Sequence, residues 1–242
     1  MRKSKQVFTV LVCMVLLFNV LLFTTGSAVY AVPPSPVTVQ SPGMNLPVLN
    51  TYQAGMFKDV GVKDWFRPYV ESVYGYGLMK GKSQTHFDPS GKVTMGEVLA
   101  AAVNLYNLYH NGKTEYEKFY QKPWYHYYVE FAYLNKLIDT YYYNFDMNKE
   151  ATRGHVAKIF STILPEEEYE VLNYVDDNAI PDVTLDMFYG EGVYKLYRAG
   201  IVTGNDPVGT YSPNSSINRA EFAAMITKIT DAKLRDRITL KK

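Results

Sequence analysis

A short pattern that starts a helix occurs three times in this sequence. Thr94, Thr152 and Asn218 are each good helix N-caps, because a side-chain oxygen at that position can accept hydrogen bonds from unpaired backbone N–H groups. An aromatic residue precedes each cap by seven positions, and a further aromatic opens a helical pattern upstream. These upstream aromatics are Trp65, Trp124 and Phe188. Three copies in one register, about 60 residues apart, indicate an internal repeat.

The residues that follow each cap predict a binding site for an anion. Glu97 and Glu221 stand three positions after their caps, where a carboxylate can reach back and complete a capping box, whereas His155 stands there in the middle copy. Arg153 and Arg219 occupy the first helical position, although the helix dipole disfavours a cation there by about 0.3–1 kcal/mol. Such a cation adds its field to the free backbone amides and attracts an anion. The alternative for each arginine is a side chain that merely extends into water.

Each copy is expected to form a helix, a loop and a second helix. Apolar and aromatic residues recur at helical spacing after each upstream aromatic and again after each cap. Gly77 and Gly81 bracket the loop of the first copy, and such glycines indicate positive φ or a close backbone approach. In the middle copy, Lys136 and Thr140 replace both loop glycines. We expect a mostly all-α chain whose repeats pack as one domain, because one repeat alone buries little surface.

The first and third copies resemble the S-layer homology (SLH) family. The segments of the first copy that carry the resemblance are residues 57–60, Trp65, and residues 77–81, 87–89 and 94–97. Those of the third copy are residues 175–176, Phe188, and residues 200–204, 211–213 and 218–221. Because all three copies share one register, residues 55–232 resemble three tandem SLH modules. The resemblance implies three helix–loop–helix repeats packed as a pseudo-threefold SLH trimer.

The resemblance also implies a function. Proteins of this family are anchored non-covalently to pyruvylated secondary cell wall polysaccharide in Gram-positive-type envelopes. The residues then expected to bind the glycan are Arg219, Arg153, Glu221, Asn218, Thr152, Trp65, Trp124, Gly81 and Gly204. In this interpretation each arginine, with the nearby amides, grips the carboxylate of a pyruvylated sugar. Met95 stands where the family has arginine, so we expect the first-copy site to bind weakly or not at all.

For His155 and for the tyrosines, the sequence allows a role in glycan binding and a simpler alternative. At mildly acidic pH, His155 could add positive charge beside the pocket of Arg153, although an ordinary surface histidine is the simpler explanation. The 22 tyrosines could stack against sugar rings, but tyrosine also fills the edge of a core while its hydroxyl stays wet. We expect burial to explain most of the tyrosines.

The two ends of the chain are expected to differ from the repeats. Arg2, Lys3 and Lys5 precede an apolar stretch and small residues suited to cleavage, so residues 1–31 are interpreted as a signal peptide, with an uncleaved membrane anchor as the alternative. Residues 32–50 form a Pro-rich linker. The repeats, with their connectors, are expected at residues 51–110, 111–164 and 165–232, followed by a charged tail at residues 233–242 that frays.

Charge and composition argue against several classes of partner. Removal of residues 1–31 takes away three basic and no acidic side chains, so the formal net charge changes from +1 to −2. That balance argues against nucleic acid, since its binding needs a concentrated basic field. The mature chain has no cysteine, and no catalytic motif or metal-ligand spacing is evident, so we expect no enzyme, cofactor or metal. Residues 176–178 with Asp182 could hold a hard cation, but a capped loop is the simpler explanation.

Two rival functions stay open. The repeats could have diverged into a protein–protein assembly module of the cell envelope with weakened glycan binding, as Met95 and the missing loop glycines allow. The chain could also be an enzyme on an anchor scaffold. The favoured interpretation is a secreted cell-wall protein at the cell surface that binds cell wall polysaccharide. Other surface-layer proteins are the alternative partners, and no membrane contact is expected after signal cleavage.

Overall fold

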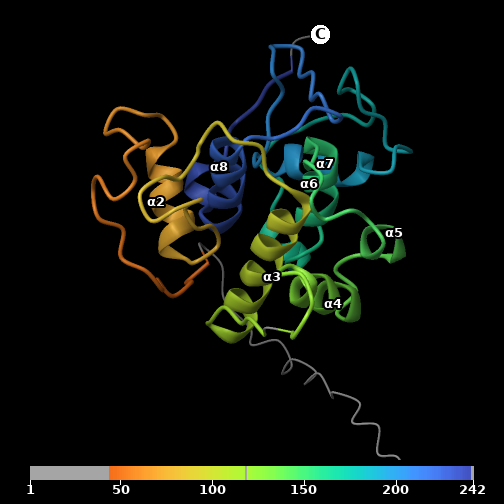
Figure 1. Ribbon diagram of the computed structural model, residues 1–242. Coiled ribbons are helices and arrows are strands. Elements are labelled where there is room, and N and C mark those ends of the chain that lie inside the picture. Colours follow the sequence, from red (N-terminus) through yellow and green to blue (C-terminus); the bar gives the residue numbers. More distant parts are fainter. Residues whose placement is uncertain (1–43, 118, 241–242) are drawn as a thin grey trace, which may run out of the picture. The chain divides into compact units, whose positions relative to one another are not determined.

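The computed structural model describes residues 44–117 and 119–240, and Figure 1 shows how its helices are arranged. Within these ranges the chain forms seven α-helices, two short 3-10 helices and three isolated β-bridges. The prediction of a mostly all-α fold is confirmed. The predicted signal peptide at residues 1–31 and most of the predicted linker at residues 32–50 lie outside the described residues. In the described part, no helix combines the length and apolar character needed to cross a bilayer.

The first helix of each repeat begins two residues after its predicted aromatic. These helices are α2 (Arg67–Gly75), α4 (His126–Leu134) and α7 (Gly190–Arg198), each of nine residues. Two positions beyond each helix, the backbone turns through the left-handed region at Gly77, Lys136 and Gly200, with φ of 71°, 58° and 71°. The predicted positive φ of the loop is confirmed, and the middle repeat adopts it without glycine.

The second helix of each repeat begins directly after its predicted N-cap. These helices are α3 (Met95–Asn111), α6 (Arg153–Phe160) and α8 (Arg219–Thr230). Thr94 and Asn218 form complete capping boxes with the glutamate three positions on. Thr152 accepts from the amide of His155, but the described contacts include no reciprocal bond from that imidazole. The predicted half-loss of the capping box in the middle repeat is therefore confirmed.

The helices of one repeat pack mainly against helices of the neighbouring repeats. α4 packs on α3 and α7 packs on α6, so each first helix lies against the second helix of the preceding repeat. α2 packs on α8, which closes the set into a ring. Figure 1 shows these three helix pairs, with the amber α2 beside the blue α8 although they lie at opposite ends of the described chain.

A triangle of backbone hydrogen bonds joins the three repeats just before the N-caps. The Val93 amide donates to Ile217, the Ile217 amide donates to Ala151, and the Ala151 amide donates to Val93, with N···O distances of 3.2, 3.2 and 2.8 Å. All three side chains are buried. Around them, each N-cap forms a bridge with the residue two positions before another N-cap. This closed geometry relates the three repeats by an approximate threefold register.

Three connecting segments contain short helices. The predicted loop of the middle repeat contains α5 (Thr140–Tyr143), whose N-cap is Asp139. The acidic connector forms the 3-10 helix η1 (Glu166–Tyr169), and a second 3-10 helix, η2 (Ala232–Leu234), follows α8. Acidic residues at the start of η1 suit the positive end of the helix dipole.

The charged tail packs against the third repeat. The Asp236 amide donates to the Gly200 carbonyl at 2.8 Å, and the Ile238 amide donates to the Asn173 side chain at 2.8 Å. The Arg235 guanidinium donates to the carbonyl of Glu168 at 2.6 Å. The prediction that the tail frays is therefore wrong for residues 233–240, because their backbone and side chains have partners in the fold.

Candidate functional site

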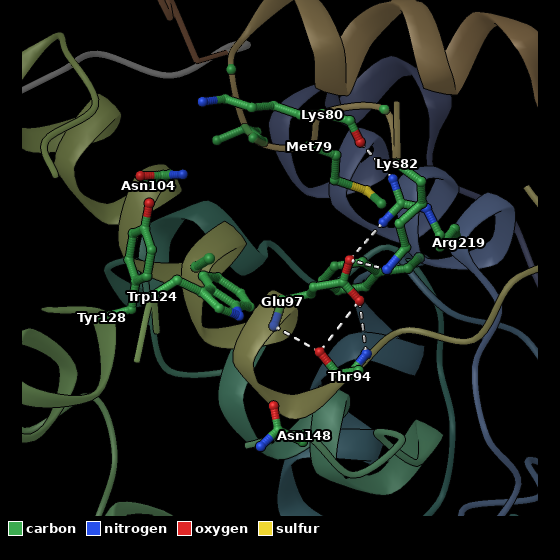
Figure 2. A pocket seen from close by; sticks show the side chains of 15 residues that line it. Met79, Lys80, Lys82, Thr94, Glu97, Asn104, Trp124, Tyr128, Asn148 and Arg219 are labelled. Atoms are coloured by element: carbon green, nitrogen blue, oxygen red, sulfur yellow. Dashed lines mark hydrogen bonds and ion pairs between the residues drawn. The ribbon is translucent and has the colours of Figure 1, made fainter. Parts of the chain in front are cut away.

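A cavity of about 470 Å³ lies where all three repeats meet. Its walls come from the loop after α2, the first turns of α3, the segment that starts α4, and the start of α8. Figure 2 shows Trp124 and Tyr128 to one side of Glu97, and Lys82 and Arg219 to the other. One wall of the cavity is therefore aromatic and the opposite wall is cationic.

Arg219 ties the third repeat to the first at the cationic wall. Its side chain is 3% exposed, and its Nε donates to the Phe87 carbonyl at 2.8 Å. One terminal nitrogen donates to Glu97 at 3.0 Å, and the other donates to the Lys80 carbonyl at 2.5 Å. The guanidinium also lies over the Phe87 ring, 4.6 Å from its centroid. Burial lowers the pKa of Arg219, and the Glu97 charge opposes that change.

Glu97 is the carboxylate at the centre of the cavity's polar contacts. It accepts from Lys82 at 2.7 Å and from the Thr94 amide at 3.0 Å, in addition to Arg219. Burial alone would raise the pKa of Glu97, but these hydrogen bonds and the Arg219 charge outweigh it and lower the pKa. Lys80 also lines the cavity and has no acidic partner among the described residues. Two cations thus contact the one carboxylate of the cavity wall and Lys80 adds a third positive charge, which leaves the cavity with net positive charge.

The backbone amides at the starts of the second helices already have partners. In α8, the amides of Arg219 and Ala220 donate to carbonyls of the first repeat, each at 2.9 Å, and the Glu221 amide donates to the Asn218 side chain. The corresponding amides of Arg153 and Gly154 donate to carbonyls of the third repeat. The expectation that free amides would help each arginine to hold an anion is wrong, because the ring closure of the repeats uses these donors.

Arg153 makes the equivalent contacts between the second and third repeats. Its Nε donates to the Tyr211 carbonyl at 2.8 Å, a terminal nitrogen donates to the Thr203 carbonyl at 3.2 Å, and the guanidinium lies 4.5 Å from the Tyr211 ring centroid. The loop here is tightly packed, since a Cβ on Gly204 would lie 2.6 Å from the Tyr197 hydroxyl oxygen. The close backbone approach predicted for the first repeat is confirmed at Gly81, where a Cβ would lie 2.5 Å from the Ser83 carbonyl oxygen.

The contact between the first and middle repeats lacks both members of the arginine–glutamate pair. Met95 occupies the position that corresponds to Arg219 and is fully buried, and His155 occupies the position that corresponds to Glu97. The nearby space is filled by aromatic packing, because buried Tyr142 lies 5.7 Å from Phe188 and 5.9 Å from His155 between ring centroids. This contact region therefore lacks the charges found around Arg219.

His155 differs from both of its sequence-based explanations. Its ring packs against Tyr142 and Phe145, and its Nδ1 is buried without a hydrogen-bond partner among the described residues. Burial lowers the pKa of His155. An ordinary surface histidine is therefore wrong, and so is added charge at mildly acidic pH, because burial disfavours the protonated form.

The structure brings three of the predicted glycan-binding residues into the cavity, namely Trp124, Gly81 and Arg219. The other predicted residues lie outside its walls, at helix caps or in the third-repeat loop; they are Arg153, Glu221, Asn218, Thr152, Trp65 and Gly204. Among the aromatics that open the first helices, Trp65 is 60% exposed, Trp124 48% and Phe188 45%, so all three present a ring to solvent.

Sequence reasoning missed three residues of the cavity. Lys80 and Lys82 flank Gly81, so the charge of this loop was a signal that could have been used. Tyr128 follows Trp124 by four positions, and that spacing places both rings on one face of the helix. The sequence could not show that these two elements, from different repeats, line one cavity.

The acidic residues considered for a cation have partners within the fold. Asp182 accepts from the amides of Tyr211 and Ser212 at 2.8 and 2.7 Å, and Asp177 accepts from Arg198 at 2.6 Å. These contacts are those of a capped loop, which was the simpler explanation. Asp59 caps the corresponding loop of the first repeat in the same way.

Comparison with known proteins finds a known domain in two segments of this chain. A family model for the S-layer homology domain matches residues 57–99 and 180–223. The SLH domain is found twice in this chain. The two matches lie in the first and third repeats, and the middle repeat, which has Lys136, Thr140 and His155 at repeat positions, lies outside them. SLH domains indicate association with the cell wall at the cell surface, and the domain itself is non-catalytic.

Two curated proteins are similar to much of this chain. Exoglucanase XynX of Acetivibrio thermocellus is 27% identical over 175 residues, which cover 68% of this chain and 15% of the relative. Amylopullulanase of Thermoanaerobacterium thermosulfurigenes is 26% identical over 173 residues, which cover 68% of this chain and 9% of the relative. The chain thus spans less than a fifth of the length of either relative, and the activities in these names are those of the relatives.

Proposed function

We propose that this chain is a secreted, non-enzymatic anchor that binds pyruvylated secondary cell wall polysaccharide non-covalently in the cavity between its repeats. The observation that carries the proposal is the cavity itself, where Lys82 and Arg219 contact a single carboxylate opposite the exposed ring of Trp124 and Lys80 adds a positive charge without an acidic partner among the described residues. An acidic sugar suits this combination, because its carboxylate takes the positive wall and the C–H face of its ring takes the aromatic wall.

The two lysines are the proposed partners of the sugar carboxylate. The Lys82 side chain is 42% exposed and Lys80 has no acidic partner among the described residues, so both keep donors for a ligand. Arg219 uses its guanidinium on Phe87, Lys80 and Glu97, and we assign it to holding the lysine-bearing loop in place. One charge-assisted hydrogen bond contributes about 1.5–3 kcal/mol to binding.

We also propose that the middle repeat, residues 111–164, is a third and diverged SLH module. The shared left-handed turn, the N-cap at Thr152 and the closed ring of helix pairs support this proposal. Met95 and His155 stand in place of the arginine–glutamate pair between the first and middle repeats, so glycan binding falls to the cavity around Lys82 and to the region around Arg153. Binding at two places on one body would strengthen retention by avidity, provided that one polymer reaches both.

Retention on purified cell walls tests the proposed function. The wild-type chain is expected to bind walls that carry the pyruvylated polysaccharide and to lose binding on polymer-stripped walls. Lys82→Ala is expected to weaken retention by about tenfold, because it removes one charge-assisted contact. Lys63→Ala, which removes an exposed lysine outside the cavity walls, is the matched control.

Double variants and binding to stripped walls distinguish the proposed function from its rivals. Arg219→Ala with Arg153→Ala is expected to release the chain, although thermal unfolding must show that the double variant remains folded. Unchanged retention of a Lys80→Ala, Lys82→Ala double variant would contradict the lysine assignment. Equal binding to stripped walls, or self-association without glycan, would instead support the protein–protein assembly function. Sugar release from whole walls would support an enzyme.

A further inference from the structure

The aromatic wall continues beyond the cavity as a line of exposed rings. Trp124 and Tyr128 are 6.2 Å apart between ring centroids, and Tyr128 lies 5.8 Å from Tyr116. Tyr116 belongs to the connector between the first two repeats, whereas Trp124 lies two residues before α4 and Tyr128 lies in its first turn. We call these three rings the aromatic strip.

The rings of the aromatic strip are available to a ligand. Trp124 is 48% exposed, Tyr116 is 53% exposed and Tyr128 is half-buried at the cavity wall. Figure 2 shows Asn104 beside the phenol end of Tyr128, so a polar group of α3 lies next to the hydroxyl while the ring borders the cavity. Exposed aromatic rings in a row, next to a positively charged cavity, provide apolar surface that a polar sugar chain can cover with its C–H faces.

We propose that the aromatic strip is a second subsite, in which neutral sugars adjoining the acidic sugar stack on Tyr128 and Tyr116. This proposal rests on the proposed function, because it requires an acidic glycan in the cavity. It gives the bound chain a direction, with the pyruvylated sugar at Lys80 and Lys82 and the following sugars along the rings. The protein would then recognise a stretch of the polysaccharide and would bind an isolated pyruvylated sugar more weakly.

The charge distribution supports neutral sugars at this subsite. Lys82 and Arg219 contact Glu97 on the wall opposite the aromatic strip. Beside the strip, Glu115 raises the pKa of neighbouring Tyr127 after the larger effect of burial, and Lys113 pairs with Glu115 at 3.0 Å. A neutral sugar needs no ionic partner beside this neutral pair, whereas a second acidic sugar would gain none from it.

The experiment compares glycan fragments of different length on the full chain by titration calorimetry. The ligands are a single pyruvylated sugar and polysaccharide fragments of one, two and four repeating units. Wild type is expected to bind the longer fragments more tightly than the single sugar. Tyr116→Ala is expected to weaken binding of the longer fragments by about fivefold and to leave binding of the single sugar unchanged. Tyr116→Phe is expected to bind as wild type does, because the ring remains.

Tyr120→Ala is the matched control, since Tyr120 lies in the same connector, is 88% exposed and makes no aromatic ring contact among the described residues. The proposal is overturned if Tyr116→Ala binds every fragment as wild type does, or if it loses the single sugar equally. It is also overturned if wild type binds the single sugar and the long fragments with equal affinity. Failure of wild type to bind any of the ligands would be a different result, because it would reject the proposed function as well.

Discussion

Arg219 is the first residue of α8 in the third repeat, yet its side chain contacts the first repeat. It donates to two backbone carbonyls, those of Phe87 and Lys80, and to the carboxylate of Glu97. Arg153 donates in the same way to two carbonyls of the third repeat. The unfavourable position of these cations at a helix N-terminus is therefore offset by hydrogen bonds to carbonyl groups between repeats, which point their negative ends at the guanidinium.

Lys136 permits a test of backbone strain at a single residue. It has φ of 58° where the other two repeats have glycine, and a left-handed L-residue costs about 1–2 kcal/mol. Lys136→Gly relieves this strain but adds conformational entropy to the unfolded chain. The net effect is expected to raise the free energy of unfolding by up to about 1 kcal/mol. Urea denaturation measures the change. Asn135→Gly, one residue earlier with φ of −88°, is the control and is expected to destabilise.

Stability is expected to fall as the solution becomes acidic, because of two half-buried histidines. Burial lowers the pKa of His155 and of His110 below the ordinary value of 6.5. The unfolded chain then binds protons more readily, so the free energy of unfolding decreases as the pH falls below about 6.5. Glu97 adds a further loss at lower pH, since its folded pKa lies below 4.5 and protonation removes its ion pairs.

Chemical denaturation at several pH values between 7 and 5 checks this prediction. His155→Leu is expected to reduce the pH dependence, because it removes one titrating group from the folded interior. His86→Ala, which changes an exposed histidine, is expected to leave the pH dependence as in wild type. A His155→Leu variant with the full wild-type pH dependence would show that this imidazole does not contribute.

At the level of helices, the start of each second helix is a joint between repeats. The first three amides of α8 donate to Gly91, Pro89 and the side chain of Asn218, so no donor remains for a ligand among them. At the start of α3, Met95 stands in place of the arginine, and in the first turn of α6, His155 stands in place of the glutamate. Both members of this charged pair are therefore replaced, which avoids a buried charge without its partner.

A double-mutant cycle tests this paired replacement. Met95→Arg alone is expected to destabilise the chain by about 3 kcal/mol, because it places a cation in a fully buried position without a carboxylate. Adding His155→Glu is expected to recover part of that loss, since the pair then matches Arg219 and Glu97. The coupling energy from thermal unfolding separates this effect from any gain of His155→Glu through its capping box. Simple additivity of the two substitutions would contradict the pairing.

For the molecule as a whole, closure of the ring determines which segments depend on one another. α2 packs on α8 across more than 140 residues of chain, and the triangle of backbone bonds at Val93, Ala151 and Ile217 involves all three repeats. No described repeat holds its own first helix against its own second helix as the main contact. We therefore expect the three repeats to fold cooperatively, because the two helices of each packed pair come from different repeats.

Fragments of the chain test this dependence. Residues 32–164 lack α7 and α8, so α2 and α6 lose their partners and the fragment is expected to show no cooperative thermal transition by circular dichroism. Mixing it with residues 165–242 is expected to restore the transition. The full chain should unfold in one step. An isolated fragment of residues 32–164 that unfolds cooperatively would contradict the dependence on ring closure.

Much of the local structure could be predicted from the sequence. The N-caps, both complete capping boxes and the left-handed turn after each first helix depend on residues within a few positions of one another. The resemblance to SLH domains rests on the same local motifs. The packing of the charged tail could not be predicted, because its partners Gly200, Asn173 and Glu168 are distant in the chain.

The sequence by itself determined where each helix begins and that the three repeats share one register, because short-range hydrogen bonding at caps and turns decides those features. Only the tertiary structure decided that Arg219 faces the first repeat, that the helix-start amides are used, and that Lys82 and Trp124 line one cavity. The physical reason is that burial of the helices is completed between repeats, so the position of each side chain depends on partners from another part of the chain.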